Sequence, residues 1–313
     1  MDLVIRPVAA GDYEALVSAG KAAIPDFSAT AQSLQESDVE QPERISQRLV
    51  AEVDGTPVGS MRYTELSRAH RPGRFTLYGW VDPSLQRKSI GTALFEAALE
   101  RLRGLGARSL RSWTSEELPH AVRFLERRGY VETERHYTST LDLTQFDFAP
   151  YEGLEERVET GSIRLLTLTE WQTYPNWDRR LFDLHTELLA DVPEPDLIPP
   201  AWERFVEEEL QSPKMIPEAT LIAVDGDRAI GTTALSRHDD DGWLQTRLTG
   251  ICREYRHRKI ALALKIKALR WARANGYSQI RTSNAGANRP MLTINERLGF
   301  VKQPAGITFS REI

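Results

Sequence analysis

Two short basic segments, QRKSIG at residues 86–91 and RHRKIA at residues 256–261, contain the residue types of an anion-binding loop. Each follows an apolar stretch and precedes a helix-forming stretch that opens at Ile90 or Ile260. The first N–H groups of a helix have no partner within the helix, and the helix dipole places partial positive charge there. Such a helix end binds phosphate groups readily. We therefore expect an anionic ligand, with a pyrophosphate as the first candidate.

The other interpretation is a basic helix start whose charges are simply solvated. Cations at a helix N-terminus are unfavourable to the dipole, so their presence in both segments favours the anionic ligand. Gly91 and Ala261 are small residues where a backbone would approach such a ligand closely. The expected contacts are Gln86, Arg87, Lys88, Ser89, Ile90 and Gly91 in the first loop, and Arg256, His257, Arg258, Lys259, Ile260 and Ala261 in the second.

The two loops belong to a long internal repeat within the 313 residues. Gly106 and Gly276, and likewise Gly129 and Gly299, are separated by 170 residues. A unit of this length is a duplicated domain, because solenoid repeats run to about 20–50 residues. We predict a first domain at residues 1–145, a linker at 146–161 and a second domain at 162–313.

Each copy is predicted to contain the same order of elements. A hairpin turns at Asp54-Gly55 or Asp225-Gly226, since Asp-Gly between alternating apolar residues favours turns with positive φ. A strand at residues 75–81 or 243–251 then leads into the basic loop and its helix. A strand, a helix and a final strand at 136–143 or 307–312 complete the copy. This order predicts an α+β fold, with a mixed, mostly antiparallel sheet flanked by helices in each domain.

Composition narrows the function classes. The net charge of −5 gives no basic surface for nucleic acid. No apolar run approaches the roughly 20 residues that span a bilayer, and the N-terminus carries acids where a signal peptide needs an apolar core. Cys252 is the single cysteine, and the sequence contains no His-Glu-x-x-His, Gly-x-Ser-x-Gly or phosphate-loop motif. We expect a cytoplasmic monomer or homodimer without a metal, a nucleic-acid partner or a membrane partner.

The loops, the hairpins before them and the Gly-aromatic pairs Gly129-Tyr130 and Gly299-Phe300 resemble the GNAT superfamily of N-acetyltransferases. The two-domain arrangement, and phrases such as TSNAGANRPMLTINERLGF (282–300), are similar to the members that include mycothiol synthase. The resemblance covers nearly the whole chain. It implies that acetyl-CoA is the co-substrate, with its pyrophosphate on the loop amides. Its pantetheine arm would lie along the strand that ends at Val81 or Ile251.

The chain departs from the family pattern at two places. The middle glycine of the loop is Ser89 in the first copy and Lys259 in the second. The tyrosine that often serves as general acid, four residues before the Gly-aromatic pair, is Leu125 or Asn295. Neither side chain can protonate a leaving thiolate, so the resemblance names no catalytic acid. No glutamate stands on the strand before either loop, so the general base is also unassigned.

The resemblance favours the second copy for the chemistry, with the first copy binding CoA or serving as scaffold. The second copy keeps Asn284 and Asn288 where the family often holds the pantetheine amides. An alternative for Asn288 is that it only caps the helix that starts near Pro290. On the acceptor side, Glu187 and Asp191, followed by Glu194 and Asp196, could attract a cationic amine. The alternative there is a solvated helix face.

The sequence therefore predicts an acetyl-CoA-dependent N-acetyltransferase whose acceptor is a small-molecule amine. Two other functions stay open. One is a non-catalytic protein that binds or senses acyl-CoA, and the other is an acetyltransferase that acts on a protein lysine or N-terminus.

Overall fold

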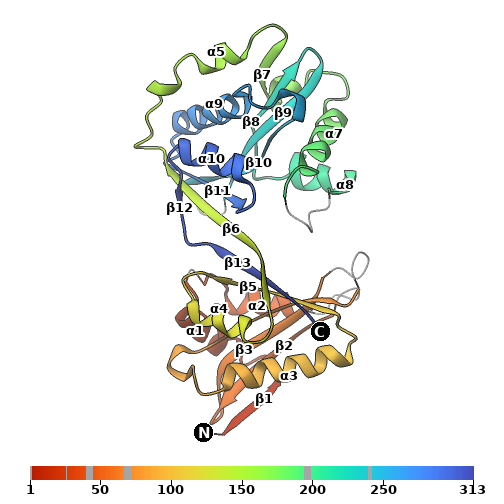
Figure 1. Ribbon diagram of the computed structural model, residues 1–313, viewed down its shortest axis with the longest axis vertical. Helices are drawn as coiled ribbons and strands as arrows, with labels where there is room; N and C mark the ends of the chain where they lie inside the picture. Colours follow the sequence, from red (N-terminus) through yellow and green to blue (C-terminus); the bar gives the residue numbers. More distant parts are fainter. Residues whose placement is uncertain (1, 26, 40–44, 67–71, 194–198, 239–241) are drawn as a thin grey trace. The chain divides into compact units, whose positions relative to one another are not determined.

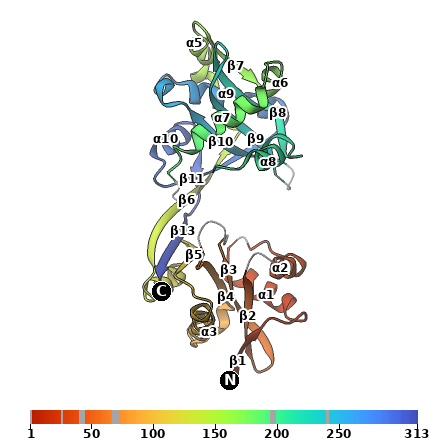
Figure 2. The same ribbon diagram turned by 90° about the vertical axis from the view of Figure 1, so that its right-hand side faces the viewer.

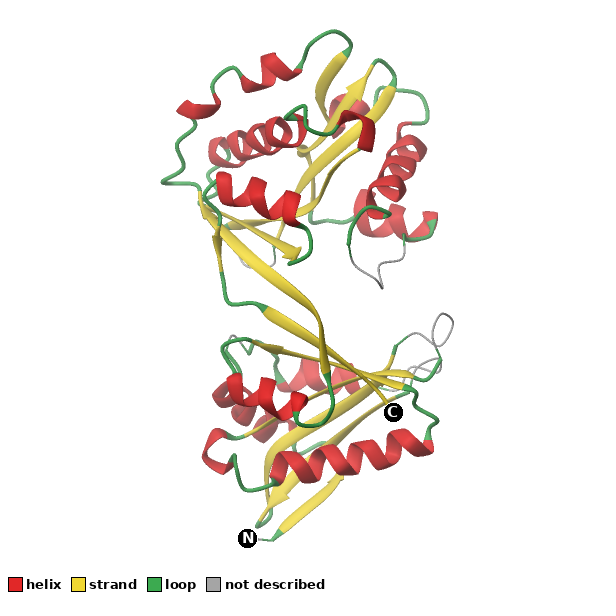
Figure 3. Ribbon diagram, viewed as in Figure 1, coloured by secondary structure: helices red, strands yellow, loops and turns green. Residues whose placement is uncertain are grey.

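The computed structural model describes residues 2–25, 27–39, 45–66, 72–193, 199–238 and 242–313 (Figure 1). The chain divides into two compact units. Unit 1 comprises residues 1–133 together with 306–313, and unit 2 comprises residues 134–305. Each unit is a mixed sheet with helices on its faces, as the sequence predicts (Figure 3).

In the described part of unit 1 the strands follow the order β1-β2-β3-β4-β5-β13. All neighbours are antiparallel except β4 and β5, which are parallel. Its elements are β1 (Leu3–Pro7), α1 (Tyr13–Ala23), α2 (Ala31–Asp38), β2 (Ser46–Val53), β3 (Thr56–Glu65), β4 (Arg74–Val81), the 3-10 turn η1 (Pro83–Leu85), α3 (Ile90–Gly104), β5 (Ser109–Ser115), α4 (Pro119–Glu126) and β13 (Gly306–Glu312).

Two apolar clusters hold this sheet between its helices (Figure 2). On one face, α3 buries Ile90, Leu94 and Phe95 against the strands. On the other face, Leu16 of α1 and Trp80 of β4 belong to a smaller cluster that also includes α2. The apolar residues on each side therefore fix which helix covers which face.

Unit 2 repeats this plan in the order β6-β11-β10-β9-β8-β7, with β10 and β11 as its parallel pair and β12 beside β6. Its elements are β6 (Val131–Asp142), η2 (Ala149–Tyr151), α5 (Leu154–Val158), β7 (Ile163–Thr167), α6 (Leu168–Trp171), α7 (Trp177–Leu189), α8 (Trp202–Phe205), the π-helical turn η3 (Val206–Leu210), β8 (Met215–Asp225), β9 (Arg228–Arg237), β10 (Trp243–Ile251), η4 (Arg253–Tyr255), α9 (Ile260–Ala274), β11 (Gln279–Ala285), α10 (Arg289–Arg297) and β12 (Val301–Lys302).

The final strands of the two copies are exchanged relative to the sequence prediction. Strand β6, expected to complete the first copy, pairs along residues 136–142 with β11 of unit 2. Strand β13, expected to complete the second copy, pairs along its whole length with β5 of unit 1 (Figure 1). Each strand buries apolar side chains in the core it joins: Leu141 in unit 2, and Ile307 and Phe309 in unit 1.

The segment expected to be a linker also belongs to unit 2. Its 3-10 turn η2 and helix α5 bury Tyr151, Leu154 and Val158 in the core of that unit. The side chain of Arg273 reaches from α9 to the carbonyl oxygen of Phe146 at 2.7 Å. The apolar residues of this segment do not recur with the period of a helix or a strand, so the sequence did not indicate that the segment contributes to the core.

The hairpin turns follow the Asp-Gly pairs closely. Asp54 and Gly55 have φ of 48° and 82° and form the two-residue turn between β2 and β3. In unit 2, Asp225 still pairs with Arg228, so the turn is centred one residue later, on Gly226 and Asp227.

Candidate active site

The parallel strands β4 and β5 separate soon after they pair. Residues 74–76 lie beside residues 109–111, and beyond them the backbone pairing stops although both strands continue. The hydroxyl of Ser112 bridges the start of the gap by donating to the carbonyl oxygen of Leu77 at 2.7 Å. Unit 2 has the same arrangement, because β10 and β11 pair only over residues 243–245 and 279–281.

Each basic loop begins its helix at this separated end, as the sequence predicts: α3 starts at Ile90 and α9 at Ile260. The loops also share an unusual backbone. Arg87 and Ser89 have φ of 64° and 66°, and the equivalent His257 and Lys259 both have φ of 62°. Alternating left-handed residues turn successive N–H groups toward one concave side, which is an anion-binding geometry.

The first residue of each loop closes the turn in the same way. The side-chain amide of Gln86 donates to the carbonyl oxygen of Val81 at 3.1 Å. The guanidinium of Arg256 donates to the carbonyl oxygen of Ile251 at 3.0 Å. These side chains therefore fasten each loop to the strand before it.

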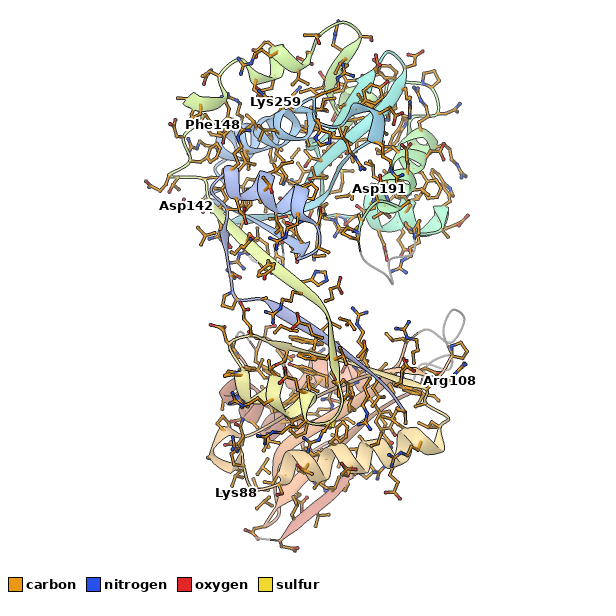
Figure 4. All side chains as sticks on the ribbon, viewed as in Figure 1. Lys88, Arg108, Asp142, Phe148, Asp191 and Lys259 are labelled. Atoms are coloured by element: carbon orange, nitrogen blue, oxygen red, sulfur yellow. The ribbon has the colours of Figure 1, made fainter. Side chains whose placement is uncertain are left out.

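The other predicted loop residues divide by exposure. Ile90 and Ile260 are buried in the cores, so only their backbone can face a ligand. Lys88 and Lys259 lie just before α3 and α9 on the exposed side of each loop (Figure 4). A Cβ at Gly91 would make ordinary van der Waals contacts, at 3.5 Å from Phe124 and 3.8 Å from Val81.

A cavity of about 600 Å³ extends from the loop of unit 1 into the gap between β4 and β5. Gln86, Arg87, Ser89 and Gly91 line its loop end. Its walls continue along Tyr78 to Val81 of β4, Ser112 to Ser115 of β5, and one side of α4. A volume of this size suits a cofactor-sized ligand.

Basic side chains from α4 lie near the loop end of this cavity. His120, Arg123, Arg127 and Arg128 all line it. Partial burial and then the charges of Arg123 and Arg87 lower the pKa of His120, so these three side chains lie close together. In the second copy, 170 residues later, Pro290 replaces His120 and Thr293 replaces Arg123, and His257 stands at the position of Arg87. The cationic cluster is thus a property of unit 1.

Backbone groups of β4 also face the gap. The N–H of Asp82 donates to Val58 of β3. Backbone N–H and C=O groups of successive residues point to alternate sides of a strand. The N–H of Gly79 therefore points to the side opposite from that of Asp82, toward β5. A side chain at Gly79 would meet backbone of β3, since its Cβ would lie 2.4 Å from the carbonyl oxygen of Ser60. The close approach of β3 and β4 explains the glycine, and the Gly79 N–H is left to face the cavity.

Unit 2 differs at the corresponding positions. Its equivalents of Thr114 and Leu125, both of which line the unit 1 cavity, are Asn284 and Asn295. These two bind each other, with the amide of Asn295 donating to Asn284 at 2.7 Å. Asn288 accepts from the N–H of Met291 at 3.3 Å and caps α10, which is the alternative that the sequence left open. A small void of about 10 Å³ in this unit adjoins Lys265.

The predicted acceptor acids of unit 2 are engaged by neighbours. Asp191, at the end of α7, pairs with Arg253 and Arg256 (Figure 4). Hydrogen bonding from Arg253 is the main cause that lowers its pKa. Burial, followed by a hydrogen bond with Glu187, raises the pKa of Cys252 to about 12. Glu194 and Asp196 lie outside the described residues.

Other kinds of site find no support in the part of the chain that the structure describes. It holds no group of three or more His, Cys, Asp or Glu side chains placed to bind a metal ion. None of its helices is long and apolar enough to cross a membrane.

Several residues that line the cavity were not predicted from the sequence. Tyr78 and Trp113 belong to no motif that would have marked them. His120 and Arg123 could have been found, because comparison of the two copies at the spacing of 170 residues shows these basic residues in the first copy only.

Solved structures share the whole tandem architecture. A GCN5-related N-acetyltransferase from Sphaerobacter thermophilus superposes with a TM-score of 0.68 at 19% identity, covering 99% of this chain and 95% of the other. A tandem GNAT protein from the clavulanic acid biosynthesis pathway gives 0.64 at 18% identity, covering 99% and 98%. At these identities the likeness establishes the fold.

Sequence comparison establishes the family. The mycothiol acetyltransferase of Geodermatophilus obscurus is 27% identical over 237 residues, which are 74% of this chain and 72% of that protein. The model of the acetyltransferase (GNAT) family matches residues 18–130 and again residues 180–300. With both copies matched over most of its length, this chain is a two-domain member of the acetyltransferase (GNAT) family.

Proposed function

We propose that this protein transfers an acetyl group from acetyl-CoA to the amine of a small molecule, and that unit 1 carries the reaction. The observation that carries the proposal is the cavity of about 600 Å³ in unit 1, which joins the loop at Gln86–Gly91 to the gap between β4 and β5. Asn284 and Asn288 had led us to favour the second copy. Asn284 bonds to Asn295, and Asn288 caps α10, so neither asparagine needs a ligand to explain its position.

In this proposal, the loop amides and the helix start of α3 hold the pyrophosphate of acetyl-CoA. Arg87 and Arg123 add positive charge near it. The pantetheine arm follows β4 in the space that β5 leaves. The N–H of Gly79 then stabilises the oxyanion that develops on the thioester carbonyl, because it points into the gap.

The reaction is a direct acyl transfer. The amine nitrogen attacks the thioester carbon, the C–S bond breaks, and the products are an amide and the CoA thiol. Alignment of amine and thioester within the cavity supplies the main rate enhancement. Leu125 lines the cavity where a catalytic tyrosine often stands, so the thiolate takes its proton from water or from another group.

Two further observations support the acceptor class. Ile24 and Pro25, between α1 and α2, line the same cavity, so the segment after α1 forms part of its wall, as expected for a pocket that receives a small molecule. The relative from Geodermatophilus obscurus is named a mycothiol acetyltransferase, which supports both the acyl group and a small-molecule reaction.

The test uses a matched pair of blocking variants. Gly91→Leu places a side chain in the unit 1 cavity, and Ala261→Leu places the same side chain at the equivalent position of unit 2. We expect Gly91→Leu to weaken acetyl-CoA binding, measured by calorimetry, and to reduce CoA release with an amine panel by at least about tenfold, which is 1.4 kcal/mol. Ala261→Leu should change neither. The reverse result would assign the reaction to unit 2, and binding without turnover in any variant would indicate a non-catalytic acyl-CoA sensor.

A further inference from the structure

A second cavity of about 330 Å³ adjoins the first in unit 1. The two cavities share five lining residues: Ile24, Pro25, Tyr78, Trp80 and Trp113. The second cavity continues toward Phe27 and Leu34, on the side of the sheet that α1 and α2 cover. A molecule in the second cavity could therefore present one end to a thioester in the first.

Aromatic rings form the shared wall. Tyr78 on β4 stacks on Trp113 of β5, with ring centroids 4.8 Å apart and planes at 8°. These two rings face each other across the gap where the strands separate. Trp80 lies 6.0 Å from Tyr78, and Phe27 packs edge-on against Trp80 at 5.3 Å. Trp113 is 53% exposed, so a large part of its indole remains open to a ligand.

The described charged side chains that line the cavities are mainly cationic. Among the described residues that line either cavity there is no Asp or Glu. The charged groups are arginines, namely Arg48 and Arg62 in the second cavity and Arg87, Arg123, Arg127 and Arg128 in the first. A carboxylate does lie behind the second cavity, but Asp38 accepts from Arg48 at 2.6 Å and pairs with Arg62 at 3.0 Å. Among the described lining residues, a polyamine or an aminoglycoside would meet guanidinium groups.

We propose that the acceptor is a monoamine that carries a flat aromatic group. Its ring stacks in the second cavity against the wall formed by Tyr78, Trp80 and Trp113, and its amine extends into the first cavity. Offset and edge-on aromatic pairs are favourable beyond the area that they bury. The inference rests on the proposed function and adds the class of acceptor. The chemistry is unchanged: the neutral amine and acetyl-CoA give the N-acetyl amine and the CoA thiol.

The experiment compares amines that differ only in the ring. 2-Phenylethylamine and 2-cyclohexylethylamine have the same carbon skeleton and similar amine basicity, but only the first is flat. We expect kcat/KM for the phenyl compound to be at least tenfold higher, and spermidine and glucosamine to be poorer still. Trp113→Leu should remove the preference by raising KM for the phenyl compound while KM for acetyl-CoA stays unchanged. Trp271→Leu, which removes a partly buried indole of α9 in unit 2, far from either cavity in the sequence, is the control.

A binding measurement separates this inference from the proposed function. Calorimetric titration of 2-phenylethylamine into the protein saturated with CoA tests the second cavity without turnover. Acetylation of all amines with no preference for the ring, or a preference for spermidine, would overturn the aromatic acceptor and leave the acetyltransferase intact. Ring-selective binding that Trp113→Leu abolishes, with no amine acetylated, would support the cavity and overturn the reaction. Neither binding nor turnover would overturn both.

Discussion

His120 lies at the start of α4, where Arg87 and Arg123 lower its pKa together with partial burial. A phosphate bound at this place would favour the imidazolium, so binding should raise the pKa of His120. The affinity for CoA should then increase as the pH falls from about 8 to about 5, by about tenfold if binding raises this pKa by about one. Calorimetry across this range checks the prediction, and His120→Asn should flatten the pH dependence. A slope that persists in His120→Asn would assign it to another group.

Ser89 and Lys259 both adopt left-handed backbone conformations where the family pattern has glycine. This conformation costs an L-residue about 1–2 kcal/mol, partly offset by the greater flexibility of an unfolded glycine. Ser89→Gly and Lys259→Gly should each raise the free energy of unfolding by about 0.5–1 kcal/mol. The loop is already in place, so the affinity of Ser89→Gly for CoA should change by less than about threefold. Urea unfolding and calorimetry measure the two effects, with Ala93→Gly, within α3, as a control that destabilises by about 1 kcal/mol. A large loss of affinity in Ser89→Gly would instead show that the serine hydroxyl contacts the ligand.

At the scale of elements, the sequence predicted best where local chemistry decides. The starts of α3 and α9 follow from the change from a basic segment to a helix-forming stretch, and the turn at Asp54-Gly55 follows from the hairpin preference of Asp-Gly. The Tyr78–Trp113 stack was not predictable in this way, because it depends on where two strands separate. The pairing of β13 with β5 was also missed, since an alternating strand does not encode which sheet edge it will join.

Helix α9 contains a buried cation that α3 lacks. Lys265, at the position of Phe95, is only 4% exposed and lies 5.6 Å from the ring centroid of Phe300. Burial lowers its pKa from 10.5 to about 8. Between pH 8 and 10.5 the unfolded chain therefore binds more protons than the folded chain, and the stability of unit 2 rises with pH. Below pH 8 the full free-energy cost of burying the charged ammonium lowers the stability of unit 2, by about 3 kcal/mol at most.

Lys265→Met should therefore stabilise unit 2 by about 1–3 kcal/mol at pH 7, with a gain that shrinks toward pH 10.5. Hydrogen exchange of the α9 amides measures this unit separately from unit 1. Lys267→Met, two residues further on, is the control. Its ammonium donates to the carbonyl oxygen of Leu165, so its removal should give no such gain. Destabilisation by Lys265→Met would show that the ammonium has a stabilising role in the fold.

At the scale of the whole molecule, the last residues of the chain complete the sheet that holds the proposed active site. Strand β13 pairs with all seven residues of β5, which carries Ser112 and Trp113 of the cavity wall. The duplication therefore does not give two independent consecutive domains. Unit 1 is completed only after unit 2 has been synthesised, because residues 306–313 follow it in the chain.

Removal of residues 306–313 should therefore impair the cavity of unit 1, although that cavity is lined by residues 23–128. The deletion uncovers the core around Ile307 and Phe309, whose burial contributes about 1.5–3 kcal/mol for each side chain, and leaves β5 as an open edge. We expect acetyl-CoA affinity to fall at least tenfold and the β5 amides to lose protection from hydrogen exchange, while α9 keeps its protection. A synthetic peptide of residues 304–313 should restore part of the affinity, and the same peptide with Ile307→Ser and Phe309→Ser should not. Unchanged acetyl-CoA affinity in the truncated protein would show that β5 keeps its position without β13. The cavity would then depend only on residues within 2–133.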